Sequence, residues 1–251
     1  MKLLKLVWLN GPFYVILLIF TLAAVPLLLL FVACQAPFVS HRRVMRLARR
    51  ALRWYGFVVI RLLAFPFVRI RYEDRTNGRA PSPAVVVCNH RSSSDPFLMA
   101  ALPLDEFVQI VNTWPFRLPI WGLGARLAEY LNINEMPVAE FFDRAGRLLR
   151  DGVTLIAFPE GTRSRTLAMG PFHGAIFRLA MQAKAPIVPV CISGNERTPR
   201  RGTMLLCPAL IRLRQLPALT WDEYRDLTPF QLKNMVRDMI ARELHVMEGP
   251  V

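Results

Sequence analysis

The chain has 251 residues, of which 53% are hydrophobic, and its formal net charge is +14. This length allows one domain with a sizeable core, and the basic balance indicates an anionic partner such as membrane lipid, a phosphorylated substrate or nucleic acid. The four cysteines are far apart and form no CxxC pair, so neither a disulfide framework nor a zinc site is implied, which fits a reducing compartment.

The N-terminal segment predicts a membrane helix. No charged residue occurs between Lys5 and His41, and the run from Phe13 to Ala36 is almost entirely apolar. As a helix this run would be about 36 Å long, enough to cross a bilayer core of roughly 30 Å. It is longer than the apolar core of a signal peptide, and no clear small-residue cleavage site follows it. Pro26 interrupts the run, so a bent or re-entrant segment is the alternative.

A basic segment follows, in which apolar residues recur at near-helical spacing between six arginines: Arg42, Arg43, Arg46, Arg49, Arg50 and Arg53. A basic amphipathic helix of this kind would lie at an anionic membrane surface. The alternative is a helix that packs on the globular domain and leaves its arginines solvated. Because far more cations follow the apolar run than precede it, the positive-inside rule places the rest of the chain in the cytoplasm, at the inner membrane if the protein is bacterial.

From Val68 onward the pattern is that of a globular domain. Alternating apolar residues predict a strand from Val68 to Tyr72 with one wet face. Short apolar runs predict buried strands at Ala84–Cys88, Val153–Phe158 and Ile187–Ile192, with helical patterns between them. A capping-box pattern, Thr228 to Gln231, begins a C-terminal amphipathic helix.

These elements predict a single α/β domain with a mixed, largely parallel sheet covered by helices. A membrane-embedded helical segment precedes that domain. We place the boundary between an anchor, residues 1–67, and the globular domain, residues 68–251.

A histidine and a carboxylate flank a short turn in Asn89-His90-Arg91-Ser92-Ser93-Ser94-Asp95. His90 follows the predicted strand, and Asp95 precedes Pro96 at a position suited to a helix N-cap. The turn between them can fold the carboxylate back onto the imidazole. A carboxylate on one ring nitrogen fixes the tautomer and makes the other nitrogen a general base. The alternative is a carboxylate that only caps a helix beside an ordinary loop histidine.

A second polar turn follows the strand ending at Phe158 and reads Pro-Glu-Gly-Thr-Arg-Ser-Arg over residues 159–165. Glycine allows close approach of the backbone to a ligand, and hydroxyl and guanidinium groups are donors suited to phosphate. This loop is therefore a candidate anion site. A third stretch, Ile187-Val188-Pro189-Val190, is an apolar strand with a central proline.

Together these three stretches resemble motifs of the glycerophosphate and lysophosphatidic acid acyltransferase family. The first motif, NHxxxxD, is present at Asn89–Asp95, and the third, FPEGTRS, matches Phe158–Ser164 letter for letter. The fourth motif, an apolar strand with a central proline, matches Ile187–Val190. The resemblance covers roughly Val68 to Arg214.

The resemblance implies transfer of a fatty acyl group from acyl-CoA or acyl carrier protein to the hydroxyl of a lysophospholipid, most specifically 1-acylglycerol-3-phosphate, giving phosphatidic acid. In this scheme His90 deprotonates the hydroxyl and Asp95 orients His90. The acceptor phosphate would be bound by Glu160, Gly161, Thr162, Arg163 and Arg165. No metal or cofactor is required, the other partners are membrane lipids, and nucleic acid is not expected.

The second motif departs from the family pattern. Members that form phosphatidic acid usually carry an arginine after an apolar run in this motif. The corresponding stretch here is Ala128–Asn134, and Asn134 stands at the arginine position. This departure leaves other lysolipid acceptors open.

Two other classes of function compete with this interpretation. A serine hydrolase would use Ser92, Ser93 or Ser94 as the nucleophile beside His90, but the G-x-S-x-G turn is missing. A non-catalytic member of the family would bind anionic membranes through its charge alone. Charge does not explain why NHxxxxD and FPEGTRS occur together.

Overall fold

The computed structural model describes residues 2–76, 78, 80–163 and 168–249. Seven strands form one sheet in the order β1-β7-β6-β2-β5-β3-β4. The strands are β1 Val68–Asp74, β2 Val85–Cys88, β3 Phe107–Val111, β4 Leu131–Asn132, β5 Thr154–Ala157, β6 Ile187–Ser193 and β7 Ala209–Gln215. The α-helices are α1 Lys2–Gln35, α2 His41–Val58, α3 Asp95–Leu98, α4 Trp114–Arg117, α5 Pro119–Leu127, α6 Val138–Arg150, α7 Ala175–Ala183, α8 Trp221–Tyr224 and α9 Pro229–Glu248.

The sheet is mixed and largely parallel, as the sequence predicted. Every neighbouring pair of strands is parallel except β6 and β7. The three predicted central strands are confirmed as β2, β5 and β6, and the C-terminal helix begins with the predicted capping box at Thr228 and Gln231. Strands β3, β4 and β7 were not among the sequence predictions.

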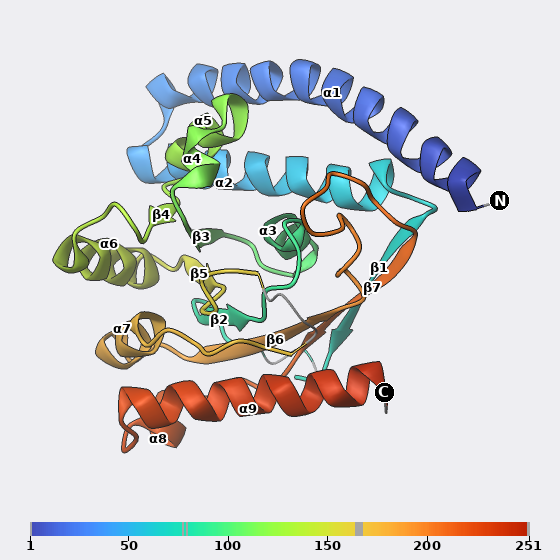
Figure 1. Cartoon of the computed structure of the whole chain (residues 1–251). Coiled ribbons are helices and arrows are strands. Elements are labelled where there is room, and N and C mark those ends of the chain that lie inside the picture. The colour runs from blue at the N-terminus through green and yellow to red at the C-terminus, as the bar shows by residue number, and fades with distance from the viewer. Residues whose placement is uncertain (1, 77, 79, 164–167, 250–251) are drawn as a thin grey trace.

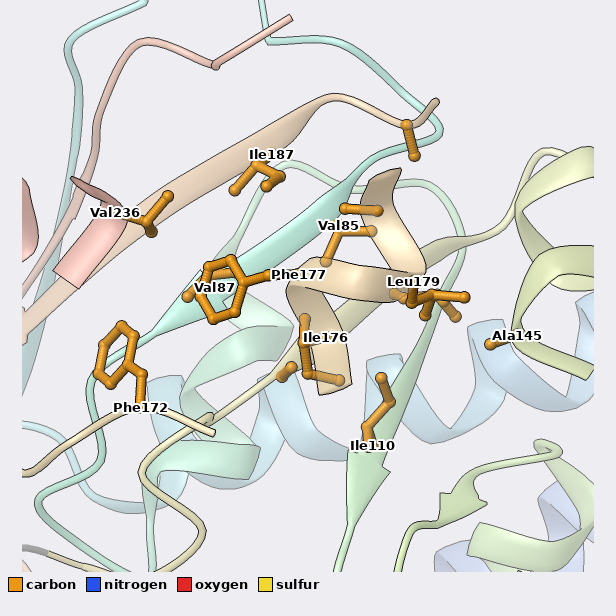
Figure 2. Close-up of a cluster of buried hydrophobic side chains, with 14 of the residues drawn as sticks. Val85, Val87, Ile110, Ala145, Phe172, Ile176, Phe177, Leu179, Ile187 and Val236 are labelled. Carbon is orange, nitrogen blue, oxygen red and sulfur yellow. The ribbon is translucent and has the colours of Figure 1, made fainter. Parts of the chain in front are cut away.

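Helices cover both faces of the sheet (Figure 1). Alternate residues of each strand point to opposite faces, so that Val85 and Val87 of β2 enter one apolar cluster and Val86 and Cys88 enter the other. The first cluster lies under α6, α7 and α9, and Figure 2 shows Phe177 of α7 beside Val87 within it. Both clusters are therefore built on the same central strand, which fixes the end of β2 in place.

The other face is covered by α2 and α3, with α1 arched over α2 (Figure 1). Helix α1 continues through both Pro12 and Pro26 and is long and apolar enough to cross a membrane. Its inner face is nevertheless packed along the body: Leu9 and Phe13 belong to the second apolar cluster, and the Thr21 hydroxyl lies 2.7 Å from the Tyr55 hydroxyl of α2. Its outer face is exposed and apolar, which indicates membrane association.

The arginines of α2 largely face the protein. Arg49 is buried and pairs with the carboxylates of Glu106 and Glu129, and Arg46 lies 3.0 Å from Glu106. Arg50 pairs with the exposed Asp105 at 2.7 Å. Charge pairing, which neither of the two sequence interpretations included, thus joins α2 to the sheet and its loops.

We expect Arg49→Ala to lower the free energy of unfolding by about 3 kcal/mol, because Glu106 would keep a buried charge with a poorer partner. The matched control is Arg43→Ala, on the same helix but exposed, which should change it by no more than about 0.5 kcal/mol. Unfolding in detergent micelles would measure both. Equal effects of the two substitutions would contradict the packing described for α2.

Candidate active site

Three segments meet at one edge of the sheet. They follow β6, β2 and β5, which are adjacent parallel strands, so their carboxyl ends lie side by side. Asn89 joins two of these ends: its side chain donates to the Ile192 carbonyl at 2.9 Å and accepts from the Ile192 amide at 2.8 Å. The Asn89 side chain thus takes the place of a backbone hydrogen-bonding partner between β2 and β6, where the turn after β2 begins.

The turn after β2 brings His90 and Asp95 together. Nδ1 of His90 lies 2.8 Å from Oδ2 of Asp95. The same oxygen accepts backbone hydrogen bonds from Arg91 at 2.7 Å and Ser92 at 3.0 Å. The expected N-cap is therefore wrong in detail, since Asp95 is the first residue of α3 and its carboxylate bonds backward to the turn.

Asp95 is completely buried, whereas 18% of the His90 side chain is exposed. The imidazole lies against the Phe158 ring, with ring centroids 4.9 Å apart. Because Nδ1 faces the carboxylate, it carries the ring proton in the neutral form. Nε2 is then the nitrogen that can accept a proton from a bound molecule.

Glu160 binds backbone. Its Oε1 accepts the amide of His90 at 2.7 Å and its Oε2 accepts the amide of Gly170 at 2.8 Å. Burial raises the pKa of this carboxyl, and the two amide hydrogen bonds act against that rise. Glu160 therefore fixes the backbone of His90 and ties it to Gly170.

The rest of the predicted anion loop, residues 161–163, follows Glu160 directly. Gly161 has a positive φ of 68°, and its carbonyl accepts from the Asn112 side chain at 2.9 Å. Thr162 is exposed, and the Arg163 carbonyl accepts from the Arg201 guanidinium at 3.0 Å. Arg165, also expected here, lies outside the described residues.

Asn134 lies close to the same loop. Its side chain donates to Oδ1 of Asn112 at 3.2 Å, and Asn112 in turn donates to Gly161. The stretch proposed as the second motif is thus connected to the third motif through one side chain. The side chain of an arginine at position 134 would start next to the loop that contains Gly161.

The serines of the turn have structural partners. The hydroxyls of Ser92 and Ser94 both donate to the Thr198 carbonyl, at 3.1 and 2.7 Å. Ser92 is also buried, so these contacts argue against a serine nucleophile at either position. Thr198 lies in the loop between β6 and β7, which sequence reasoning did not connect with the site.

That loop also supplies Asn195, whose side-chain amide donates to Oδ1 of Asp95. Sequence reasoning missed this residue. The available signal was Gly194 followed by a polar residue directly after a buried strand. Gly194 has φ of 83°, and a Cβ there would collide with the Leu210 carbonyl.

An apolar pocket opens beside the turn, with a volume of about 790 Å³ when its solvent-open mouth is included. Ser93 of the His90–Asp95 turn and Pro96 of α3 line it, together with side chains of α2, α5 and β3. A second groove, with about 530 Å³ of empty space, runs between α1, α2 and α5. Leu52, Tyr55 and Trp121 line both, so the two are adjacent.

The comparison with known families agrees with this arrangement. The acyltransferase family profile matches residues 69–193. The chain is 26% identical over 225 residues to a 1-acyl-sn-glycerol-3-phosphate acyltransferase of Limnanthes douglasii, covering 80% of each chain. It is 33% identical over 174 residues to 1-acyl-sn-glycerol-3-phosphate acyltransferase alpha of Mus musculus, covering 64% of this chain and 58% of that one.

A solved structure shares the whole fold. The crystal structure of the 1-acyl-sn-glycerophosphate (LPA) acyltransferase from Thermotoga maritima superimposes with a TM-score of 0.82. The alignment covers 100% of this chain and 99% of that chain, at 18% sequence identity.

We expect Glu160→Gln to lower the free energy of unfolding by about 1.5–3 kcal/mol, since an amide has one acceptor oxygen and cannot serve both backbone N–H groups. Thermal unfolding in detergent would show this as a lower midpoint. Glu140→Gln is the matched control, because Glu140 is partly exposed on α6 and its ion pair in the described part of the chain is with Arg144, one turn away. A Glu160→Gln protein as stable as the control would contradict the assigned hydrogen bonds.

Proposed function

Because this chain belongs to the glycerophosphate and lysophosphatidic acid acyltransferase family, we propose that it transfers a fatty acyl group from an acyl thioester to the free hydroxyl of a lysophospholipid. We propose 1-acylglycerol-3-phosphate as the acceptor, which gives phosphatidic acid. The observation that carries this proposal is the His90–Asp95 pair, with 2.8 Å between Nδ1 and Oδ2, beside a large apolar pocket.

The geometry supports direct transfer. Nε2 of His90 takes the proton from the acceptor hydroxyl while that oxygen attacks the thioester carbonyl. The tetrahedral intermediate then expels the thiolate, which receives the proton back from the imidazolium. The buried Asp95 carboxylate holds the imidazole in one tautomer and stabilises its positive charge. No acyl-enzyme forms, and neither a metal nor a cofactor takes part in these steps.

The apolar pocket suits the acyl chain of the donor. Its walls are mostly apolar, and Ser93 and Pro96 place one end of it beside the His90–Asp95 turn. A fatty acyl chain bound there would bring its thioester to the same edge of the sheet as His90. The donor is acyl-CoA or acyl carrier protein, and both present the same thioester to this pocket.

The loop of Gly161, Thr162 and Arg163 is our candidate for the acceptor phosphate, with Arg165 as a further predicted contact. Guanidinium, hydroxyl and backbone N–H groups are the usual donors to phosphate. Glu160 supports the loop indirectly by holding Gly170 and His90. Asn134 in place of arginine favours a broader range of lysophospholipid acceptors.

We propose that α1 lies within the membrane interface along the body of the protein. Apolar contacts extend along its inner face from Leu9 to Leu28, whereas its outer face is apolar and exposed. A perpendicular crossing would carry α2 and its charged residues into the bilayer. The charge bias around the apolar run supports the cytoplasmic face, where lysolipid could reach the pocket from the membrane.

The central test measures thiol release from acyl-CoA or acyl carrier protein with a panel of lysophospholipids. His90→Ala should lower kcat by about 10²–10⁴-fold, because general-base catalysis is lost. Asp95→Asn should be severely impaired while its far-UV circular dichroism stays native. Wild-type turnover in His90→Ala would refute the mechanism. A wild-type protein that binds anionic vesicles and releases no thiol would instead be a non-catalytic family member.

We expect Asn134→Arg to shift acceptor preference toward 1-acylglycerol-3-phosphate. One charged hydrogen bond to phosphate is worth about 1.5–3 kcal/mol, or roughly 10–150-fold in affinity, and it favours the more highly charged phosphomonoester. Ratios of kcat/KM for several lysophospholipids would measure this shift. Arg163→Ala should raise the acceptor KM more than the donor KM. A wild-type enzyme already strict for 1-acylglycerol-3-phosphate, and unchanged by Asn134→Arg, would refute the assignment of the second motif.

A further inference from the structure

The environment of the Asp95 carboxylate is divided between two segments of the chain. Oδ2 accepts from the His90 ring and from the backbone of Arg91 and Ser92, all within its own turn. Oδ1 accepts from the Asn195 side chain, which comes from the loop after β6. A completely buried carboxylate needs such donors in place of water. On the described residues, Asn195 is the side-chain donor to Oδ1.

Asn195 is itself rigidly held. It is completely buried and directly follows Gly194, whose backbone passes against Leu210. Its carbonyl accepts the Thr198 amide at 2.9 Å, which closes a tight turn. The pairing of Asn89 with Ile192 fixes the spacing between this turn and the one that carries Asp95.

The turn of residues 195–198 contacts the His90–Asp95 turn at several points. Thr198 accepts the hydroxyls of Ser92 and Ser94, and Glu196 lies 2.7 Å from the Arg91 guanidinium. Consecutive residues Asn195 and Glu196 therefore bind opposite ends of the NHxxxxD turn.

The orientation of the Asn195 side chain follows from the charge of its neighbour. Its Nδ2 faces Asp95, since its oxygen would be repelled there. The amide of Asn195 is thus matched to the carboxylate that orients the general base.

We propose, building on the acyl-transfer function above, that Asn195 is a positioning residue that fixes the orientation of the Asp95 carboxylate. It acts on the reaction only through Asp95 and His90. Removing it leaves Oδ1 without its side-chain donor, so the carboxylate holds the imidazole less firmly in the Nδ1–H tautomer. The acceptor and donor sites are not touched by this residue.

Kinetics test the role in transfer. Asn195→Ala should lower kcat about 10- to 100-fold, the equivalent of one charged hydrogen bond, with both KM values within about twofold. In the Asp95→Asn background the same substitution should cost less than about threefold, because the interaction it removes is already lost. Thr203→Val is the control: it removes a hydrogen bond to Arg200 at the tip of the same loop and should leave kcat within twofold.

Histidine-selective ¹⁵N NMR tests the positioning independently of turnover, and the chain has only four histidines. His90 should be in the Nδ1–H tautomer in the wild type and should become a mixture of tautomers in Asn195→Ala, with His90→Gln giving the assignment. An unchanged tautomer, or equal kinetic losses in both backgrounds, would overturn the proposal. A wild-type protein with the expected NMR response but no acyl transfer would overturn the proposed function and leave the positioning role supported.

Discussion

The buried carboxylate of Asp95 is the constraint on which the site depends. A charge with no access to water must be matched by donors, and here the chain supplies a ring nitrogen, two backbone amides and a side-chain amide. Those donors come from two loops at the ends of neighbouring strands β2 and β6. The parallel alignment of these strands is therefore what brings the donors together around Asp95.

A second carboxylate in the site, that of Glu160, is also matched by hydrogen-bond donors from two segments. Glu160 uses both oxygens to hold the amides of His90 and Gly170, so it ties the loop after β5 to the histidine. His90 is thus fixed from its ring by Asp95 and from its backbone by Glu160. The segments after β2 and β5 each contribute one of these anchors, and the imidazole edge bearing Nε2 is left for chemistry.

Much of this could be predicted from sequence because the signals were local. Strands β2, β5 and β6 are apolar runs buried on both faces, and the pairing of His90 with Asp95 spans only five positions. The missing parts are long-range. Asn195 meets Asp95 across 100 positions, and the charge of Arg49 does not reveal that Glu106 lies opposite it. The sequence gives the number of charged side chains, whereas the fold determines which of them form ion pairs.

The attachment of α1 bears on how this architecture can diversify. Asn10, inside the apolar helix, donates to the Leu206 carbonyl at 2.9 Å and accepts the Leu206 amide at 2.7 Å. Leu206 belongs to the loop that carries Asn195. A chimera that borrowed the helix of another protein would thus have to supply a new partner for this backbone, or accept a loosened loop. Helix α1 and this loop therefore form one structural unit, joined by two buried hydrogen bonds.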